Sequence, residues 1–422
     1  MSMFRSLRNR NYRLFITGQL IKTIGVWMMF IAQDWLVLEL SADSATALGV
    51  VTALQFTPVL LLTLWSGRLA DRYDKRLLLL IVNAAWGALA LAMSLLVITD
   101  LVELWHVFAF AALLGTVNAV ETPVRQSFVS ELVGTSLLPN ALSLSSATYN
   151  TSRIVGPAIA GVAIAAFGLG PVFLVSALGS LAPLSGLFRM RVSELYRDDL
   201  LAATGREQAR IVDGIRYVAR RPDLLLPLGL VLVVGMALFN FQLTLAALAK
   251  TTFNTGAEAF GLFTTAFGIG SLSGALASGA RRGRPSSWVV LGSALAAGVF
   301  GTLVGLAPQY WLVMILLPIT GFWLIYFAQA ANQRLQLGVD AAYRGRVVAL
   351  WTFVFFGTNP IGAPIIGWIA ETYGAGASIW IGGVITVVVS GAALMWQLRR
   401  TGARVRLRVL PVPKFYVVPP DA

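Results

Sequence analysis

Two acidic side chains, Asp34 and Glu121, lie inside long apolar stretches of the chain. A carboxylate in such a stretch is removed from water, and it can gain and lose a proton as its surroundings alternate between wet and dry. We therefore consider both residues as sites of proton exchange. Asp34 comes late in its apolar stretch, so a position in a water-filled vestibule is an equal alternative for it.

A second group of charges is concentrated in the ten positions from Gly67 to Arg76, which hold six charged residues between two apolar runs. A turn of this charge between two long apolar helices must lie at a membrane surface. Basic residues such as Arg72 and Arg76 serve there as a topology signal. Asp71 is not needed for that signal, so it requires a separate explanation.

Arg153 is a cation well inside another apolar run, where an unpaired charge costs at least a few kcal/mol. It must therefore face a cavity or a partner. Asn150 and Arg153 share one helix face, and Asn118 and Glu121 share another. We hypothesise that Glu121 and Arg153 pair or compete for one another.

Aromatic and amide side chains on other predicted helices complete the wall of a central cavity, and a cavity of this kind suits a bulky amphiphilic small molecule. Simple packing between helices is the alternative for the aromatic residues. The proposed cavity residues are Gln19, Lys22, Asn118, Asn150, Arg153, Tyr326, Gln329, Gln333, Trp351, Phe355 and Asn359.

Several kinds of chemistry are excluded by composition and motif. The chain has no cysteine and one histidine, His106, which excludes disulfides, thiol chemistry and a histidine cluster for a metal. No G-x-x-x-x-G-K-[ST] motif is present, so ATP is not expected to drive the protein directly. No nucleophile, base and orienting group stand at a recognisable spacing. We expect that the protein is not an enzyme and that it has no metal site and no cofactor.

The elements that position these residues are transmembrane helices. Only 12% of the 422 residues are charged and 57% are hydrophobic, whereas soluble domains average about 25% charged residues. A helix needs about 20 mainly apolar residues to cross a bilayer. The sequence predicts an all-α polytopic membrane protein with twelve spans near residues 13–38, 47–67, 77–99, 104–124, 141–167, 170–189, 224–249, 257–280, 287–307, 309–332, 347–370 and 376–397.

The net charge of +13 comes from basic residues in alternate loops, which argues against a nucleic-acid partner. Basic residues gather, for example, around Lys75 and from Arg399 onward. The intervening loops carry acids such as Asp43 and Asp100, with Lys250 as the exception. By the positive-inside rule this asymmetry places both termini in the cytoplasm, in agreement with an even number of spans.

Residues 190–222 separate two similar halves. Ile211, Ile215 and Val218 recur there at helical spacing, which predicts an amphipathic helix on the cytoplasmic face. The stretch 150–168 resembles 357–374, and two parallel six-helix repeats are typical of one large transporter class. The predicted units are an N-terminal bundle (1–189), a cytoplasmic linker (190–222), a C-terminal bundle (223–398) and a basic, proline-rich cytoplasmic tail (399–422) that follows anionic lipid or has no regular structure.

The segment from Gly67 to Arg76 resembles the loop signature of the major facilitator superfamily, roughly G-x-L-A-D-R-x-G-R-R/K, with Asp74 where the family usually has glycine. The sequence RIVGPAIAG, which contains Gly156, Pro157 and Gly161, resembles the fifth-helix motif of the superfamily's exporters. Together with QDWLV at 33–37 and TPVRQ at 122–126, it suggests the drug exporter branch that includes macrolide efflux pumps and the enterobactin exporter.

This resemblance implies a cytoplasmic gate formed by Gly67, Asp71, Arg72 and Arg76. In the superfamily the aspartate lies against the start of the eleventh helix, here near residues 344–347, where the positive end of the helix dipole favours a carboxylate. The resemblance also implies that the fifth-helix motif packs the two halves together near the outside. Ordinary packing of small residues between helices is the alternative for that motif.

The function that the resemblance implies is secondary active export of a small amphiphilic compound, such as a drug or siderophore, by alternating access and in exchange for protons. The membrane would be the bacterial cytoplasmic (inner) membrane. The alternatives are a lipid or lysolipid flippase on the same fold, and a non-transporting membrane scaffold or receptor. We expect a monomer whose partners are the small-molecule substrate, protons and membrane lipids.

Overall fold

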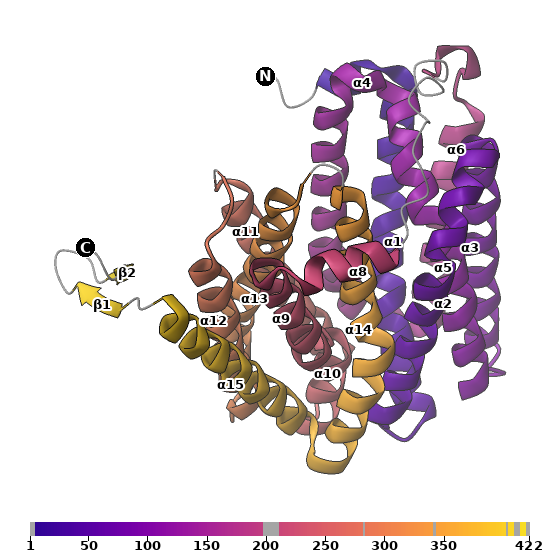
Figure 1. Cartoon of the computed structure of the whole chain (residues 1–422). Helices are drawn as coiled ribbons and strands as arrows, with labels where there is room; N and C mark the ends of the chain where they lie inside the picture. Colours follow the sequence, from indigo (N-terminus) through magenta and orange to yellow (C-terminus); the bar gives the residue numbers. More distant parts are fainter. Residues whose placement is uncertain are drawn as a thin grey trace.

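The computed structural model of the chain describes residues 5–196, 211–281, 283–340, 343–401, 404–408 and 414–418. Nearly all of these residues are helical, and Figure 1 shows how the helices are arranged. The predicted fold class is confirmed, because eleven helical stretches among the described residues are long and apolar enough to cross a bilayer. One of them, α4, contains two of the twelve predicted spans.

The N-terminal half begins with a short 3-10 helix (Arg5–Arg8) and consists of α1 to α6. Its last span is divided at Ser180, whose hydroxyl donates a hydrogen bond to the Ala177 carbonyl. The helices are α1 (Arg10–Leu40), α2 (Ala45–Arg72), α3 (Lys75–Ile98), α4 (Leu104–Phe167), α5 (Leu169–Gly179) and α6 (Leu181–Phe188), followed by a 3-10 helix at Val192–Glu194.

Helix α4 reverses direction at Gly134. The φ angle there is 68°, in the left-handed region that glycine adopts without a steric cost. Tyr12 holds the two arms close to α1, because its hydroxyl donates to the Ala141 carbonyl on the second arm while its ring packs in one apolar cluster with Phe128 on the first. The arms 104–133 and 135–167 are therefore the fourth and fifth spans.

The C-terminal half consists of α9 to α15, and the short helix α8 precedes it. Residues 197–210, which belong to the predicted linker, lie outside the described residues. The elements are α8 (Ile211–Ala219), α9 (Pro222–Leu238), α10 (Phe241–Ala247), a π-helical turn (Leu248–Thr252), α11 (Ala257–Gly279), α12 (Ser287–Leu306), α13 (Tyr310–Gly338), α14 (Arg344–Tyr373) and α15 (Ala375–Thr401).

The loops fall on two sides of the molecule. We call the side that holds the loops at 73–74, 189–196, 280–281 and 283–286 the basic side; helix α4 reverses direction there, at the top of Figure 1. The opposite side holds the loops at 41–44, 99–103 and 253–256, and the turn between α14 and α15 lies there, at the bottom of Figure 1.

The turn between α2 and α3 is short, because α2 ends at Arg72 and α3 begins at Lys75. Asp74 caps α3: its side chain accepts a hydrogen bond from the Leu77 backbone N–H at 3.0 Å. Its φ of −58° is accessible to any residue. The departure from the family's glycine therefore leaves the turn unstrained and supplies a helix N-cap.

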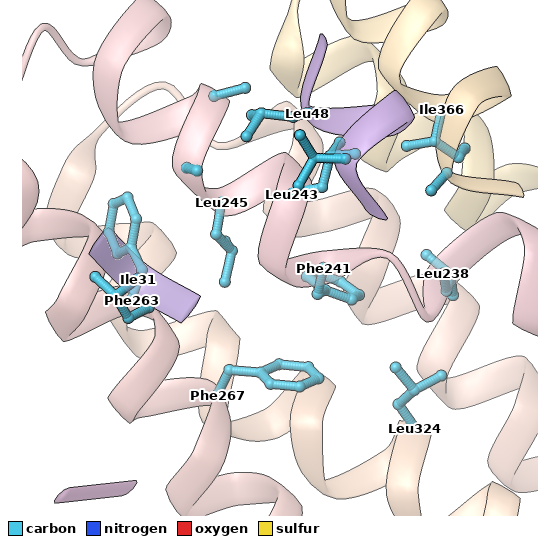
Figure 2. Packing of buried hydrophobic residues seen from close by; sticks show 14 of the residues in the cluster. Ile31, Leu48, Leu238, Phe241, Leu243, Leu245, Phe263, Phe267, Leu324 and Ile366 are labelled. Atoms are coloured by element: carbon cyan, nitrogen blue, oxygen red, sulfur yellow. The ribbon is translucent and has the colours of Figure 1, made fainter. Parts of the chain in front are cut away.

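The halves share an apolar core. Ile31 and Leu48 of the N-terminal half belong to one cluster with Leu243, Phe263 and Ile366 of the C-terminal half (Figure 2). Helix α2 packs along α14, and the second arm of α4 packs along α11. The two bundles therefore meet across a continuous apolar surface.

The tail contains two strands, β1 (Arg404–Arg408) and β2 (Lys414–Val418), which pair antiparallel with Arg404 opposite Val418. This arrangement differs from the prediction that the region follows the lipid surface or has no regular structure. The sequence RVRLR alternates basic and apolar residues with a period of two, and KFYVV is rich in aromatic and β-branched residues. Both features are typical of strands.

Candidate functional site

The first buried constellation joins α1 to the first arm of α4. Lys22 Nζ lies 2.6 Å from Glu121 Oε2, and their side chains are only 2% and 8% exposed. Arg125 lies one helical turn beyond Glu121, with its Nε 3.9 Å from the other carboxylate oxygen. Lys22 also sits over the ring of Trp86 on α3, 5.1 Å from its centroid. The charge of Glu121 is thus balanced by two cations inside the N-terminal half.

The hypothesis pairs Glu121 with Arg153. In the structure, the carboxylate of Glu121 instead accepts a hydrogen bond from Lys22. Arg153 lies instead between aromatic rings of both halves. Its guanidinium is 5.8 Å from the Trp27 ring of α1 and 5.6 Å from the Phe267 ring of α11. A cation between ring faces gains electrostatic stabilisation without a carboxylate partner.

The second constellation joins the two halves through Asp34. Its Oδ2 accepts a hydrogen bond of 2.8 Å from the Gln242 side chain on α10, and Asp34 is 6% exposed. Asp34 thus lies at a closed contact between the bundles. Its partner is a neutral amide, in contrast to the two cations beside Glu121.

Two further contacts join the halves at the opposite side. Lys250 Nζ lies 2.8 Å from Asp43 Oδ1. Glu371 accepts hydrogen bonds from the Ser44 hydroxyl at 2.7 Å and from the Thr46 backbone N–H at 2.8 Å, so its carboxylate lies at the N-terminus of α2. That position is favourable because the positive end of the helix dipole points at the carboxylate. We call these contacts, with that of Asp34 and Gln242, the inter-half latch.

The sequence alone does not predict this latch. The one signal for it was Lys250, a basic residue in a loop series that is otherwise acidic. The pairing with Asp43 explains why a cation stands there. The role of Glu371 could not be found from sequence, because its partners are more than 300 residues away in the chain.

The predicted fifth-helix motif lies on the second arm of α4. A Cβ built on Gly161 would stand 2.9 Å from the Ala257 carbonyl oxygen and from the Glu258 Cα, both of α11. Gly261 of α11 packs in turn against the Pro157 carbonyl. Gly156 faces α1, where the Ile24 carbonyl would be 3.0 Å from its Cβ. The motif therefore packs against both halves.

The predicted gate residues lie at the end of α2 and the start of α3. The bonds described for this segment stay within the N-terminal half: Lys75 Nζ is 2.5 Å from Glu131 Oε1, and Arg76 Nε donates to the Leu187 carbonyl at 2.8 Å. Arg72 is exposed. The side chain of Asp71 lies outside the described side chains.

The spacing between the halves changes along α2. A Cβ built on Gly49 would be 2.6 Å from the Ala363 carbonyl oxygen of α14. A Cβ built on Gly357 of α14 would be 3.5 Å from Leu60 Cδ1. Farther toward the basic side, a Cβ built on Gly67 would have no heavy atom of the described residues within 4 Å. The described contacts between α2 and α14 thus reach from the opposite side to the middle of the helices.

The remaining predicted cavity residues divide between buried and open positions. Gln19 and Lys22 are buried in the N-terminal half rather than on an open wall. Trp351 and Phe355 stack with centroids 5.9 Å apart, and Tyr326 is bonded to Arg281. The partly or fully exposed members are Asn118, Asn150, Gln329, Gln333 and Asn359. Within the described residues, no cluster of three or more His, Cys, Asp or Glu side chains is placed to hold a metal ion.

Comparisons with known proteins agree with this architecture. A family described as "Transmembrane secretion effector" matches residues 1–414. The staphyloferrin A transporter of Staphylococcus aureus is 25% identical over 387 residues, which cover 90% of this chain and 94% of that one. The multidrug efflux pump Tap of Mycolicibacterium fortuitum is 26% identical, with 86% and 90% covered. The enterobactin exporter EntS of Shigella boydii is 27% identical, with 84% and 81% covered.

Solved structures show the same fold at low sequence identity. The nucleoside transporter NupG matches with a TM-score of 0.73 and 12% identity, and the match covers 91% of this chain and 98% of that one. A bacterial homologue of the human lysosomal transporter Spinster matches with a TM-score of 0.66 and 15% identity, covering 92% and 95%. With the family match over nearly the whole chain, these findings identify it as a multi-pass membrane protein of the transmembrane secretion effector family, a family of major facilitator superfamily transporters and not of enzymes.

Proposed function

We propose that this protein exports a small amphiphilic compound of drug or siderophore type across a bacterial inner membrane, by alternating access and in exchange for protons. The names of its relatives, an efflux pump, a siderophore transporter and a siderophore exporter, support this class of substrate. The observation that carries the proposal is the one-sided contact between the halves within the described residues, which is tight at Gly49 and absent at Gly67 on the same helix.

One-sided contact supports alternating access for a physical reason. The latch contacts of Asp34, Asp43 and Glu371 hold the bundles together on the opposite side. A second state would break them and form contacts on the basic side, where the family places the Asp71 gate. Each state is then stabilised by a small set of polar contacts, and a substrate or proton can shift the balance between them.

Asp34 is the stronger of the two proton-coupling residues in this proposal. It is a buried carboxylate whose described hydrogen bond crosses between the halves, so a change in its charge acts directly on the contact that must break. Glu121 lies within one half, and its charge is already balanced by Lys22 and Arg125. That arrangement favours a structural role for Glu121.

The test is transport by purified protein in proteoliposomes. Antibiotics, dyes, siderophores and lysolipids are first screened for binding, and the compound that binds is then followed under an imposed pH gradient. Uphill movement that depends on the gradient is expected. Tight binding of a lysolipid alone, with no movement of any soluble compound, would instead support the flippase alternative.

Asp34→Asn should abolish gradient-driven accumulation and leave ligand binding and downhill exchange largely intact, because the amide keeps the shape and an acceptor for Gln242 but cannot change charge. Glu121→Gln is assayed separately, at an equal amount of folded protein. If both single variants and the double variant keep full pH-driven accumulation, proton coupling through these carboxylates is excluded.

A further inference from the structure

A basic pocket lies on the basic side, where α8 packs against the beginnings of α9 and α14. Its volume is about 530 Å³. The two tyrosine rings in its wall stack nearly parallel, with centroids 4.3 Å apart. The wall consists of Arg216, Tyr217, Arg220, Arg221, Tyr343 and Arg346.

The wall contains four arginines, and the two carboxylates bonded to it, those of Asp223 and Asp340, do not balance their charge. Arg221 makes an ion pair of 3.0 Å with Asp223, but Arg284 outside the pocket shares the same carboxylate oxygen at 2.8 Å. The hydrogen bond that Arg221 donates to Asp223 raises the pKa of Arg221 above its usual value, so Arg221 stays charged at any physiological pH. Asp340 accepts a hydrogen bond of 2.7 Å from the Tyr217 hydroxyl.

Three of the arginines have donors that no acceptor of the described residues occupies. Arg216 and Arg220 are exposed, and no carboxylate of the described residues is bonded to them. The Arg346 guanidinium sits over the Tyr343 ring at 5.2 Å, and its buried Nε has no hydrogen-bond partner among the described residues. A buried donor without a partner is costly, and an anion in the pocket would satisfy it.

From this geometry we propose that the pocket binds a phosphate group of an anionic ligand, foremost the headgroup of an anionic phospholipid. Guanidinium groups bind phosphate oxygens through paired N–H donors, and four arginines converge here. The pocket lies at the membrane-surface ends of α9 and α14, and basic pockets at such a level bind lipid headgroups. A soluble phosphate would satisfy the same donors.

The site would also hold α8 in place. Its wall combines Arg216 and Arg220 from α8 and its end with Arg221 before α9 and Arg346 of α14. A phosphate bonded to these groups links α8 to the C-terminal half by contacts that the protein alone does not make. Occupancy should therefore stabilise the folded protein.

The experiment uses the full chain, stripped of lipid in detergent, with thermal unfolding as the readout at constant ionic strength. Short-chain phosphatidylglycerol, short-chain phosphatidylcholine and inorganic phosphate are titrated separately. Phosphatidylglycerol should raise the unfolding temperature, whereas the zwitterionic lipid should have a much smaller effect. Arg216→Gln with Arg220→Gln should weaken the apparent affinity about tenfold, since each surface arginine contributes modestly to anionic-lipid binding.

Arg189→Gln is the matched control, because Arg189 is exposed on the same side but lies outside the pocket. It should leave the titration unchanged. An equal shift with inorganic phosphate supports the site and assigns it to a soluble anion, whereas a shift with phosphatidylglycerol alone assigns it to lipid. Arg346→Gln should weaken either response. The proposal is overturned if neither anion shifts the unfolding temperature, or if the pocket variants respond like the wild type.

Discussion

At the scale of single residues, the buried pair of Lys22 and Glu121 explains how two charges persist inside the apolar helices of the N-terminal half. The ammonium and the carboxylate are 2.6 Å apart, and Arg125 approaches the second oxygen of the carboxylate. Removal of one partner from a buried pair leaves a buried charge poorly compensated, whereas removal of both leaves only Arg125, which is partly exposed. The two kinds of variant should therefore behave differently.

Lys22→Met or Glu121→Gln alone should lower the free energy of unfolding by about 3–5 kcal/mol, the typical cost of an unpaired buried charge. The double variant should cost clearly less than the sum of the two. The free energy of unfolding of the two single variants and the double variant is measured by tryptophan fluorescence. The exposed pair of Arg191 and Glu194 is the control, and its neutralisation should cost about 0–1 kcal/mol. Additive losses for Lys22 and Glu121 would show that the pair is not coupled.

At the scale of elements, the second arm of α4 approaches α11 so closely that side chains are excluded at Gly161 and Gly261. The Thr265 hydroxyl adds a hydrogen bond of 3.1 Å to the Ile154 carbonyl. Close backbone approach of this kind is typical of helix packing in membranes. Helices there associate largely through van der Waals contact, and small residues allow the backbones to come close.

Gly161→Ala should lower stability by about 1–3 kcal/mol, because the new methyl group would stand 2.9 Å from the Ala257 carbonyl oxygen and the helices must separate. Gly292→Ala is the matched control, since no heavy atom in the described part of the chain lies within 4 Å of its added Cβ. That variant should be neutral or slightly stabilising, because alanine favours a helix more than glycine by about 1 kcal/mol. Equal effects on thermal unfolding would contradict close packing at Gly161.

The sequence was sufficient to predict the helices, because apolar length and loop charge are local properties. It predicted the polar residues that had to lie within the spans, such as Asp34, Lys22 and Arg153. It could not predict their partners: Glu121 is bonded to Lys22, 99 positions away, and Asp34 to Gln242, 208 positions away. Such pairs depend on how the helices rotate and pack. The strands of the tail lie outside the apolar helical runs, and their pairing depends on a contact between two short segments.

At the scale of the whole molecule, the two bundles have a polarity that the loop charges define. We predict that single cysteines at Tyr73 and Leu337 react with an impermeant maleimide from the cytoplasmic side only, and that cysteines at Leu101 and Gln309 react from outside only. All four positions are exposed, and the chain has no cysteine of its own. Inverted and right-side-out vesicles provide the two sides. Reversed labelling of either pair would overturn the orientation.

In the proposed alternating-access cycle, the latch should set the balance between the two proposed states. A net hydrogen bond contributes about 0.5–1.5 kcal/mol, and each 1.4 kcal/mol changes a population ratio tenfold. Loss of the Lys250 and Glu371 contacts together should therefore shift a large fraction of molecules, while the apolar contact around Leu48 and Ile366 remains.

The most direct test of alternating access is a pair of spin-label distance measurements in lipid nanodiscs. One pair, Tyr73→Cys with Leu337→Cys, spans the halves on the basic side; the other, Leu101→Cys with Gln309→Cys, spans them on the opposite side. In the background of Lys250→Met with Glu371→Gln, the basic-side distances should shorten and the opposite-side distances should lengthen. Unchanged distributions, or a shift in the same direction on both sides, would contradict alternating access between these bundles.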